Sequence, residues 1–142
     1  MAKKIICIDD DQDVIDFLSI TLGAKGYELE TASDGEEGYN KACSFKPDMI
    51  VLDVMMSHST EGFHTAYKFR QNEDLKYVPI LMLTSINQEF NYNFSMEKDG
   101  EFLPVDDFVE KPISSQLLLE KTAKLLETPK DQINISGKKK VI

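Results

Sequence analysis

The sequence contains few of the residues that build disulfide frameworks or zinc sites. Its only cysteines are Cys7 and Cys43, which lie too far apart in the chain to form a CxxC motif, and its only histidines are His58 and His64. Structural zinc sites use four ligands of these types, with short spacings between them, so the sequence offers no zinc site. We expect both cysteines to be buried, reduced thiols.

Long hydrophobic runs are also missing. The longest, at residues 49–52 and 79–83, are far below the roughly 18 residues that a membrane-spanning helix needs. The run at 5–8 is too short for the hydrophobic region of a secretory signal. We therefore expect a cytoplasmic protein that does not interact with membranes.

Positive charge is scarce. Sixteen Lys and Arg residues stand against 25 Asp and Glu residues, which gives a net charge of −9. Binding to nucleic acid requires clustered positive charge, so nucleic acid is not an expected partner. The sequence does have a balanced composition, 42% hydrophobic and 29% charged, and its 142 residues fit one domain with a substantial core.

Short apolar runs alternate with longer amphipathic stretches along the chain. Continuous apolar runs are typical of strands buried on both faces, and apolar residues spaced by three and four are typical of helices. This alternation predicts an α/β fold in which a doubly wound, five-stranded parallel sheet has helices on both faces. The expected strands are residues 4–8, 27–32, 49–52, 79–83 and 107–109. The expected helices are residues 13–24, 35–45, 61–72 and 115–127.

Smaller signals complete this pattern. Asp34 and Ser114 come just before two of the expected helices and are expected to cap them. Residues 85–105 are ambiguous between helix and loop. The domain is expected to span residues 1–127, and residues 128–142 are expected to be a C-terminal tail or linker.

Polar residues follow the predicted strands at the points where they end. Asp9 and Asp10 come after the first strand, Asp53 after the third, Thr84 after the fourth and Lys111 after the fifth. Right-handed crossovers place the carboxyl ends of parallel strands at one edge of the sheet, which is where ligands bind in such folds. We therefore expect these side chains to meet.

Three neighbouring carboxylates repel one another, and a hard divalent cation such as Mg²⁺ relieves that repulsion. A carboxylate beside the ion can attack phosphorus and form an acyl phosphate. The hydroxyl of Thr84 and the ammonium group of Lys111 can then bind the phosphoryl oxygens. The pattern predicts a phosphoaspartate site.

Four segments of the chain resemble the receiver domain of two-component response regulators. They are KIICIDDDQDVIDFL at 4–18, PDMIVLDVMM at 47–56, PILMLTS at 79–85 and DDFVEKPIS at 106–114. Together, and in this order, they span nearly the whole chain from residue 4 to about 127. The resemblance implies the flavodoxin-like fold with strand order 2-1-3-4-5.

The resemblance also implies the roles of the acidic residues. Asp53 would be the phosphoacceptor. Asp9 and Asp10 would be the acid pair that holds Mg²⁺ together with Asp53, and the backbone carbonyl of Met55 would complete the protein ligands.

Four further positions match the family pattern. Thr84 and Lys111 would contact the phosphoryl group. Phe108 stands at the aromatic switch position, where the family often has Tyr. Pro112 would be joined to Lys111 by a cis peptide bond, an isomer that costs little before proline.

Partners follow from the same resemblance. A sensor histidine kinase or a phosphotransfer protein would donate the phosphoryl group, and a downstream protein would bind the 85–113 surface and the last helix. Residues 85–107 hold six acids and one base, so a basic partner is expected. The chain would be a monomer or a weak, phosphorylation-dependent dimer. It would not be an enzyme, apart from Mg²⁺-dependent self-phosphorylation from small donors and self-dephosphorylation.

Two departures and two alternatives remain open. The loop VMMSHSTEG after Asp53 has Ser57 where the family usually has Pro, which places His58 near the site, and the interval from Thr84 to Lys111 is longer than usual. One alternative is a small Mg²⁺-dependent phosphatase of haloacid-dehalogenase type with an Asp nucleophile after the first strand. The sequence DDDQD at 9–13 lacks the last residue of its DxDx[TV] motif. The other is an inert protein-binding module.

Overall fold

The computed structural model describes residues 2–53, 61–85 and 104–134. Within these ranges strands and helices alternate along the chain. The strands are β1 (Lys4–Ile8), β2 (Glu28–Ala32), β3 (Met49–Asp53), β4 (Ile80–Ser85) and β5 (Asp107–Lys111). The helices are α1 (Gln12–Gly23), α2 (Gly35–Phe45), α3 (Glu61–Gln71) and α5 (Ser115–Leu126), followed by a 3-10 helix at Lys130–Gln132.

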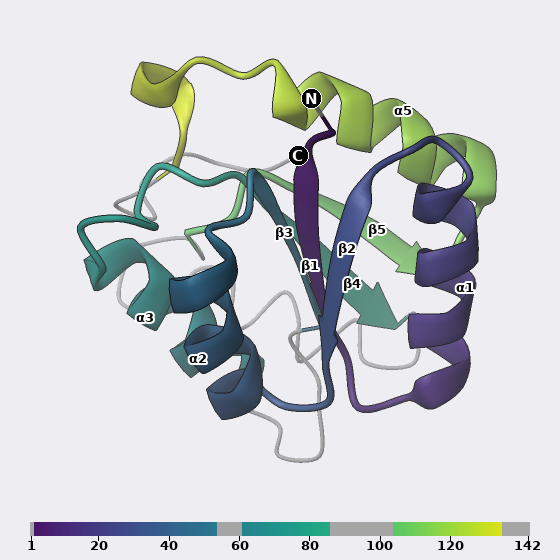
Figure 1. Ribbon diagram of the computed structural model, residues 1–142, viewed down its shortest axis with the longest axis horizontal. Helices are drawn as coiled ribbons and strands as arrows, with labels where there is room; N and C mark the ends of the chain where they lie inside the picture. Colours follow the sequence, from purple (N-terminus) through teal and green to yellow (C-terminus); the bar gives the residue numbers. More distant parts are fainter. Residues whose placement is uncertain (1, 54–60, 86–103, 135–142) are drawn as a thin grey trace.

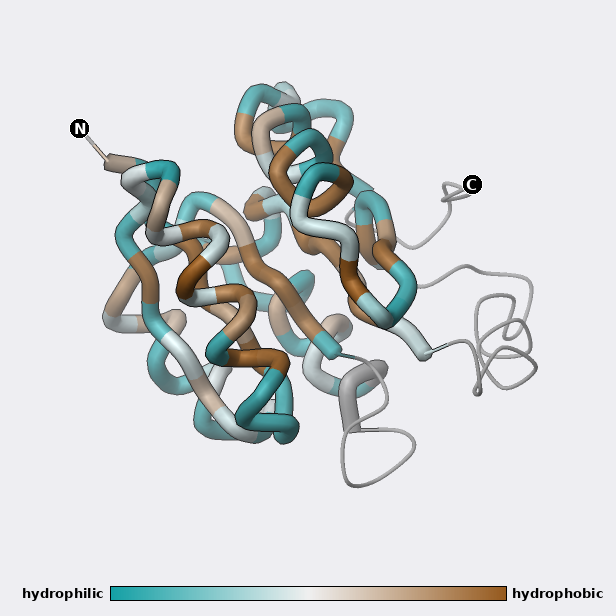
Figure 2. The backbone as a smooth tube through the Cα atoms, turned by 90° about the vertical axis from the view of Figure 1, so that its right-hand side faces the viewer, coloured by the Kyte–Doolittle hydropathy of each residue, from teal (hydrophilic) through white to brown (hydrophobic). Residues whose placement is uncertain are grey.

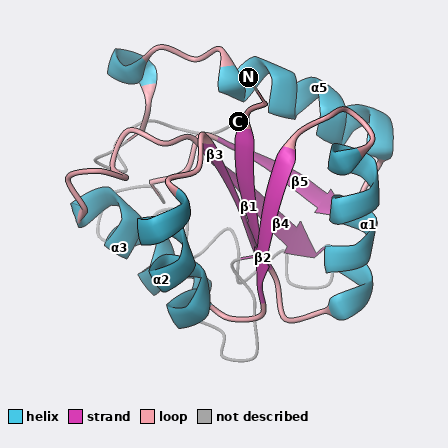
Figure 3. Cartoon of the chain, in the orientation of Figure 1, coloured by secondary structure: helices cyan, strands magenta, loops and turns pink. Residues whose placement is uncertain are grey.

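The five strands form one parallel sheet in the order β2-β1-β3-β4-β5. Helices α2 and α3 cover one face of this sheet, and α1 and α5 cover the other (Figure 1, Figure 3). The predicted doubly wound fold and strand order are confirmed. Because the chain turns from β2 on one side of β1 to β3 on the other, the order reverses at the carboxyl ends of β1 and β3, where ligands bind in such sheets.

Each face of the sheet has its own hydrophobic cluster. Ile6 and Ile8 of β1 belong to the cluster under α2 and α3, whereas Ile5 and Cys7 belong to the cluster under α1 and α5. All four side chains are fully buried. Successive side chains of a strand point to opposite faces, so burial on both sides explains why the strands read as continuous apolar runs. Hydrophobic segments accordingly line the centre of the molecule (Figure 2).

Side-chain caps fix the starts of the helices. Asp34 accepts a hydrogen bond from the backbone N–H of Glu37 at 2.7 Å, and Ser114 accepts one from the N–H of Leu117 at 3.3 Å. Both predicted caps are confirmed. After α1, Gly26 adopts a φ of 87°, a left-handed conformation that favours glycine, and turns the chain toward β2.

Three strands extend further toward their carboxyl ends than predicted. β3 includes Asp53, β4 continues to Ser85 and β5 continues to Lys111. Their polar side chains ended the apolar pattern, but the backbone pairing continues, with Thr84 opposite Glu110. The sheet therefore holds the backbone of these site residues directly.

Other expectations met mixed outcomes. Cys7 is buried, but Cys43 is exposed, so the expectation of two buried thiols is wrong for Cys43. On α2 the neighbouring residue, Ala42, takes the buried position instead. The ambiguous segment lies almost entirely outside the described residues, at 86–103. None of the helices described has the length and apolar character to cross a bilayer.

The chain beyond α5 folds back onto the domain. The sequence predicted a tail or linker from residue 128, but Ile133 and Asn134 are only 4% and 3% exposed. Asn134 donates hydrogen bonds to the carboxylate of Asp106 and to the carbonyl oxygen of Val105. These contacts join residues that are distant in the sequence, so a local sequence pattern could not predict them.

Candidate functional site

Residues from four strands meet at the carboxyl edge of the sheet. Asp9 directly follows β1, Asp53 ends β3, Thr84 is the penultimate residue of β4, and Lys111 ends β5. The strands β1, β3, β4 and β5 are consecutive neighbours in the sheet. The structure therefore brings together residues that are up to about a hundred positions apart in the sequence, as the strand ends predicted.

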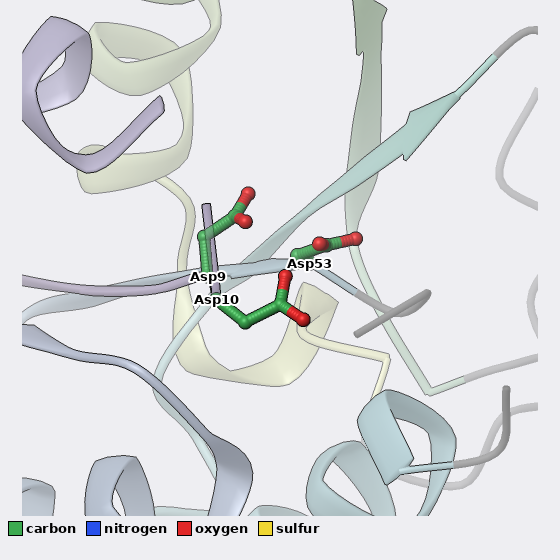
Figure 4. Close-up of side chains that lie close together, drawn as sticks. All are labelled: Asp9, Asp10 and Asp53. Carbon is green, nitrogen blue, oxygen red and sulfur yellow. The ribbon is translucent and has the colours of Figure 1, made fainter. Parts of the chain in front are cut away.

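Two of these residues, together with Asp10, form an acidic cluster. Asp9, Asp10 and Asp53 each offer a carboxylate oxygen, and these oxygens lie within 4.8 Å of one another. Figure 4 shows the three carboxylates gathered beside the ends of β1 and β3. Asp9 and Asp53 are buried, with 1% and 3% of their surface exposed, and Asp10 is exposed. A cluster with two buried acids and one face open to solvent fits a hydrated, oxygen-coordinated divalent cation.

Lys111 supplies the compensating positive charge. Its Nζ lies 3.0 Å from Oδ2 of Asp9 and 3.3 Å from Oδ2 of Asp53. Burial lowers the pKa of Lys111, but attraction from Asp53 and then Asp9 outweighs this effect, so the pKa is raised overall. The ammonium group is therefore charged at neutral pH and bridges two strands.

One cation does not balance three carboxylates, and the remaining negative charge affects the pKa of Asp9. Burial, followed by repulsion from Asp53, raises the pKa of Asp9 from 3.8 to about 6. The N–H of Asp11 donates to Oδ1 of Asp9 at 2.9 Å and acts in the opposite direction, as does Lys111. Oδ2 of Asp9 accepts no hydrogen bond of good geometry from the part of the chain that is described. A buried carboxylate oxygen that has an ion-pair contact with Lys111 but no well-aligned hydrogen bond, beside two more acids, fits a bound Mg²⁺.

Thr84 presents a buried hydroxyl group at the same edge of the sheet. Its Oγ1 is buried and, within residues 2–53, 61–85 and 104–134, has no hydrogen-bond partner. The strand register places Asp53 opposite Leu83, the residue before Thr84. Because buried hydroxyl groups are almost always hydrogen-bonded, this hydroxyl is well placed for a group that arrives at the acidic cluster.

Phe108 connects β5 to α5. It is half-buried and packs against the cluster under α2 and α3. Lys121 of α5 donates from Nζ to the carbonyl oxygen of Phe108 at 2.6 Å, and the same Nζ lies 5.0 Å from the centroid of the Phe108 ring. Lys121 also pairs with Asp107 at 3.0 Å. A change in the position of Phe108 would therefore alter these contacts with Lys121 of α5.

The remaining predicted positions are divided. The Lys111–Pro112 peptide bond is cis, the isomer that the resemblance implies. Met55 and His58 lie outside the described residues, as does most of the expected partner surface at 85–113.

Sequence reasoning missed a groove of about 510 Å³ beside Lys111. Ile15, Leu18 and Leu22 are the buried residues of α1, whereas Val14 and Phe17 are only half-buried. The sequence signal for this groove is the pair of apolar residues Val14 and Phe17, which follow the acidic residues Asp11 and Asp13. The groove is lined by Asp11, Asp13, Val14, Phe17, Ser85, Lys111, Pro112 and Ile113.

Comparison with known sequences identifies relatives of the chain. Residues 5–123 match the family model of the response regulator receiver domain. Over 114 residues the chain is 40% identical to the alkaline phosphatase synthesis transcriptional regulatory protein PhoP of Bacillus subtilis, a match that covers 80% of this chain and 44% of PhoP. The chain spans about half the length of the curated relatives it matches.

Solved structures agree. A putative response regulator from Chloroflexus aurantiacus superposes with a TM-score of 0.79 at 26% identity, covering 90% of this chain and 100% of the other. The receiver domain of the sensor histidine kinase PA1611 from Pseudomonas aeruginosa, solved with magnesium coordinated in its active site cleft, superposes with a TM-score of 0.78, covering 90% and 100%. At 18% identity the second match shows the shared fold alone. The chain belongs to the response regulator receiver domain family, the phosphoacceptor signalling modules of two-component systems.

Proposed function

We propose that Asp53 accepts a phosphoryl group from a phosphohistidine on a sensor histidine kinase or a phosphotransfer protein. The observation that supports this most is the buried Asp53 carboxylate at the end of β3, with the Lys111 ammonium group 3.3 Å away. A carboxylate oxygen attacks phosphorus while the phosphorus–nitrogen bond of the donor breaks. The imidazole nitrogen keeps the electron pair and takes up a proton, and Asp53 becomes an acyl phosphate.

Magnesium would be held by the carboxylates of Asp9, Asp10 and Asp53, with the Met55 carbonyl as the further ligand that the resemblance implies. When bound, the ion neutralises the acids and the incoming phosphoryl oxygens. The buried Oδ2 of Asp9, which has an ion pair with Lys111 but no well-aligned hydrogen bond from the described residues, supports this assignment. Receiver domains bind Mg²⁺ in their acidic active site, and the Pseudomonas receiver described above holds magnesium in its cleft.

Lys111 and Thr84 would bind the phosphoryl oxygens. Lys111 already contacts Asp53, so its ammonium group can follow the negative charge from the carboxylate onto the phosphoryl group. Thr84 would donate its Oγ1 hydroxyl, which has no hydrogen-bond partner among the described residues. The phosphoryl group would give this donor a partner, which makes the movement of Thr84 a means of sensing the modification.

The groove beside Lys111 supports the approach of a protein donor. Val14 and Phe17 offer an apolar contact surface next to Lys111, and Asp11 and Asp13 give its rim negative charge. A donor surface with apolar and basic side chains would complement it. In this arrangement the phosphohistidine would approach Asp53 from the side of α1 and the loop after β5.

Phosphorylation would change the conformation of β5 and α5. The charge added at Asp53 would draw Thr84 toward it, Phe108 would turn inward, and Lys121 would transmit the change to α5. We propose that residues 85–113 and α5 bind a basic downstream protein, with the chain a cytoplasmic monomer or a weak phosphorylation-dependent dimer. Self-phosphorylation from small donors and self-dephosphorylation would be its only catalysis.

Labelling with acetyl phosphate and Mg²⁺, followed by mass mapping, tests the phosphoacceptor. The expected label is one phosphoryl group on Asp53, absent in Asp53→Asn. A suitable control is Asp16→Asn, which changes an exposed acid of α1 and should be labelled normally. Because acyl phosphates are labile, reduction with borohydride before digestion would preserve the position of the label.

Two results would contradict the proposal. Label on Asp9 or Asp11 with continued turnover of the donor would favour the haloacid-dehalogenase-type phosphatase. No label on any aspartate, in a protein that binds Mg²⁺ and is folded, would favour an inert binding module.

A further inference from the structure

A second polar network lies at the amino-terminal edge of β4 and β5, the edge opposite the acidic cluster. Its centre is an ion pair between Arg70 of α3 and Asp106, with the guanidinium 2.8 Å from Oδ2 and side chains only 3% and 5% exposed. Burying an ion pair is costly unless its remaining hydrogen-bonding groups are satisfied. The surrounding chain segments meet that requirement.

Arg70 uses its other donors on backbone carbonyls. Nε donates to Pro104 at 2.9 Å, and NH1 donates to Lys76 at 3.0 Å and to Val78 at 2.6 Å. Burial lowers the pKa of Arg70, and attraction from Asp106 opposes this effect. The arginine therefore joins the end of α3 to the turn before β4 and to the segment that enters β5.

Asp106 satisfies its carboxylate from three directions. Oδ2 accepts from Arg70 and from the N–H of Ile80 at 2.8 Å, while Oδ1 accepts from the N–H of Asn134 at 2.8 Å. The donor to Oδ1 thus comes from the segment after α5. Without that segment, a buried carboxylate oxygen would lose this partner.

The segment after α5 makes further contacts of its own. The side-chain amide of Asn134 donates to the carbonyl oxygen of Val105 at 3.0 Å. Ile133 is 4% exposed. Lys130 lies 5.9 Å from the ring centroid of Tyr77, a side chain that is itself 39% exposed. Asn134 thus contributes both a backbone and a side-chain donor, which is a specific mode of recognition.

We propose that the surface around Val105 and Asp106 is an intramolecular docking site for residues 128–134, recognised through Ile133 and Asn134. The docked segment completes the hydrogen bonding of the Arg70–Asp106 pair. It also fixes the path of the chain along the edge where the strands begin, away from the edge that holds Asp53 (Figure 1). The inference does not depend on the proposed function.

Hydrogen exchange on the full chain tests the docking. The amides of Gln132, Ile133 and Asn134 are hydrogen-bonded and should be protected. Asn134→Asp replaces the donor to Val105 with an acceptor beside the Asp106 carboxylate, so exchange at these amides should rise by roughly tenfold or more. Gln132→Ala changes an exposed side chain of the same segment and should leave their exchange unchanged. Equal exchange in Asn134→Asp and the wild type would overturn the proposal.

A peptide experiment tests recognition directly. The full-length variant Ile133→Ala/Asn134→Ala should leave the site open, and a synthetic peptide of residues 128–142 should then shift the amide resonances of Val105 and Asp106. The wild type should show no shift, because its own tethered segment has a high effective concentration at the site. If the double variant does not fold, Asn134→Asp takes its place. Absence of a shift in the opened variant, or protection in the wild type that rises with protein concentration, would overturn the intramolecular assignment.

Discussion

Asp9 combines burial with negative neighbours, and this makes it a source of pH-dependent stability. Its pKa is raised from 3.8 to about 6. Between these values the folded state binds more protons than the unfolded state, so the free energy of unfolding falls as the pH rises through this window. Stability from this group is fully present below pH 4 and is lost above about pH 6. At neutral pH the ionised Asp9 carboxylate therefore lowers the free energy of unfolding of the metal-free protein.

Asp9→Asn should raise the free energy of unfolding at pH 7.5 by about 1–2 kcal/mol in metal-free buffer, because a neutral amide removes the repulsion. Near pH 4 the difference from the wild type should almost disappear. Urea denaturation in EDTA at both pH values measures the effect, with Asp16→Asn as the matched exposed control. A gain of equal size at both pH values would show that Asp9 does not titrate in this range.

Lys111, in contrast to Asp9, should stabilise the folded protein at neutral pH. Its ammonium group contacts Asp9 and Asp53, so Lys111→Met should leave both carboxylates without their cation. Because the side chain is 23% exposed, the loss of unfolding free energy should be about 1–2 kcal/mol, below the range for fully buried pairs. Denaturation without metal measures it, and Lys124→Met, an exposed position of α5, is the control. Similar losses in both variants would remove the ion pairs from the explanation.

At the scale of elements, the close approach of α2 to β1 depends on Gly38. A Cβ at this position would lie 2.7 Å from Cγ1 and 3.2 Å from Cγ2 of Ile8, which is fully buried. Ile8 is the last residue of β1, so movement of α2 would disturb the strand that leads into Asp9. Packing therefore overrides the preference of helices for alanine over glycine.

Gly38→Ala should lower the free energy of unfolding by about 1–3 kcal/mol despite its better helix propensity. Asn40→Ala, an exposed position of the same helix, should be neutral or slightly stabilising. Thermal and urea unfolding compare the two. Combining Gly38→Ala with Ile8→Ala should cost less than the sum of the single changes, since the clash disappears, and strict additivity would show that the contact is not the cause.

Elements also show where sequence patterns are reliable. Helix α2 was predicted with its observed bounds, and the capping residue Asp34 marks its start. The buried faces were less predictable. On α5 the polar Thr122 is buried, whereas the apolar Ala123 beside it is exposed. An amphipathic pattern fixes the face of a helix only to within about one residue when several small or mixed residues flank it.

At the scale of the whole molecule, the acidic edge was predictable because its residues follow buried strands, and parallel topology brings such positions together. The strand order came from family resemblance, since apolar runs carry no information about which strands pair. The Arg70–Asp106 pair and the docking of Asn134 were not predicted. Two of the partners of Arg70, Pro104 and Asp106, lie 34 and 36 residues away in the sequence.

Magnesium should stabilise the whole molecule through the cluster of Asp9, Asp10 and Asp53. These acids lie within 4.8 Å of one another in a chain of net charge −9, so an ion that binds only the folded state adds its binding free energy to folding. At a Mg²⁺ concentration about 100 times the dissociation constant, this is about 2.7 kcal/mol, on the order of 10 °C in Tm.

Asp10→Asn should lose most of the shift, because it removes a ligand from the exposed side of the cluster. Calorimetry with Mg²⁺, compared with NaCl of equal ionic strength, separates binding from screening. Asp16→Asn should keep the full shift, and an undiminished shift in Asp10→Asn would place the ion elsewhere.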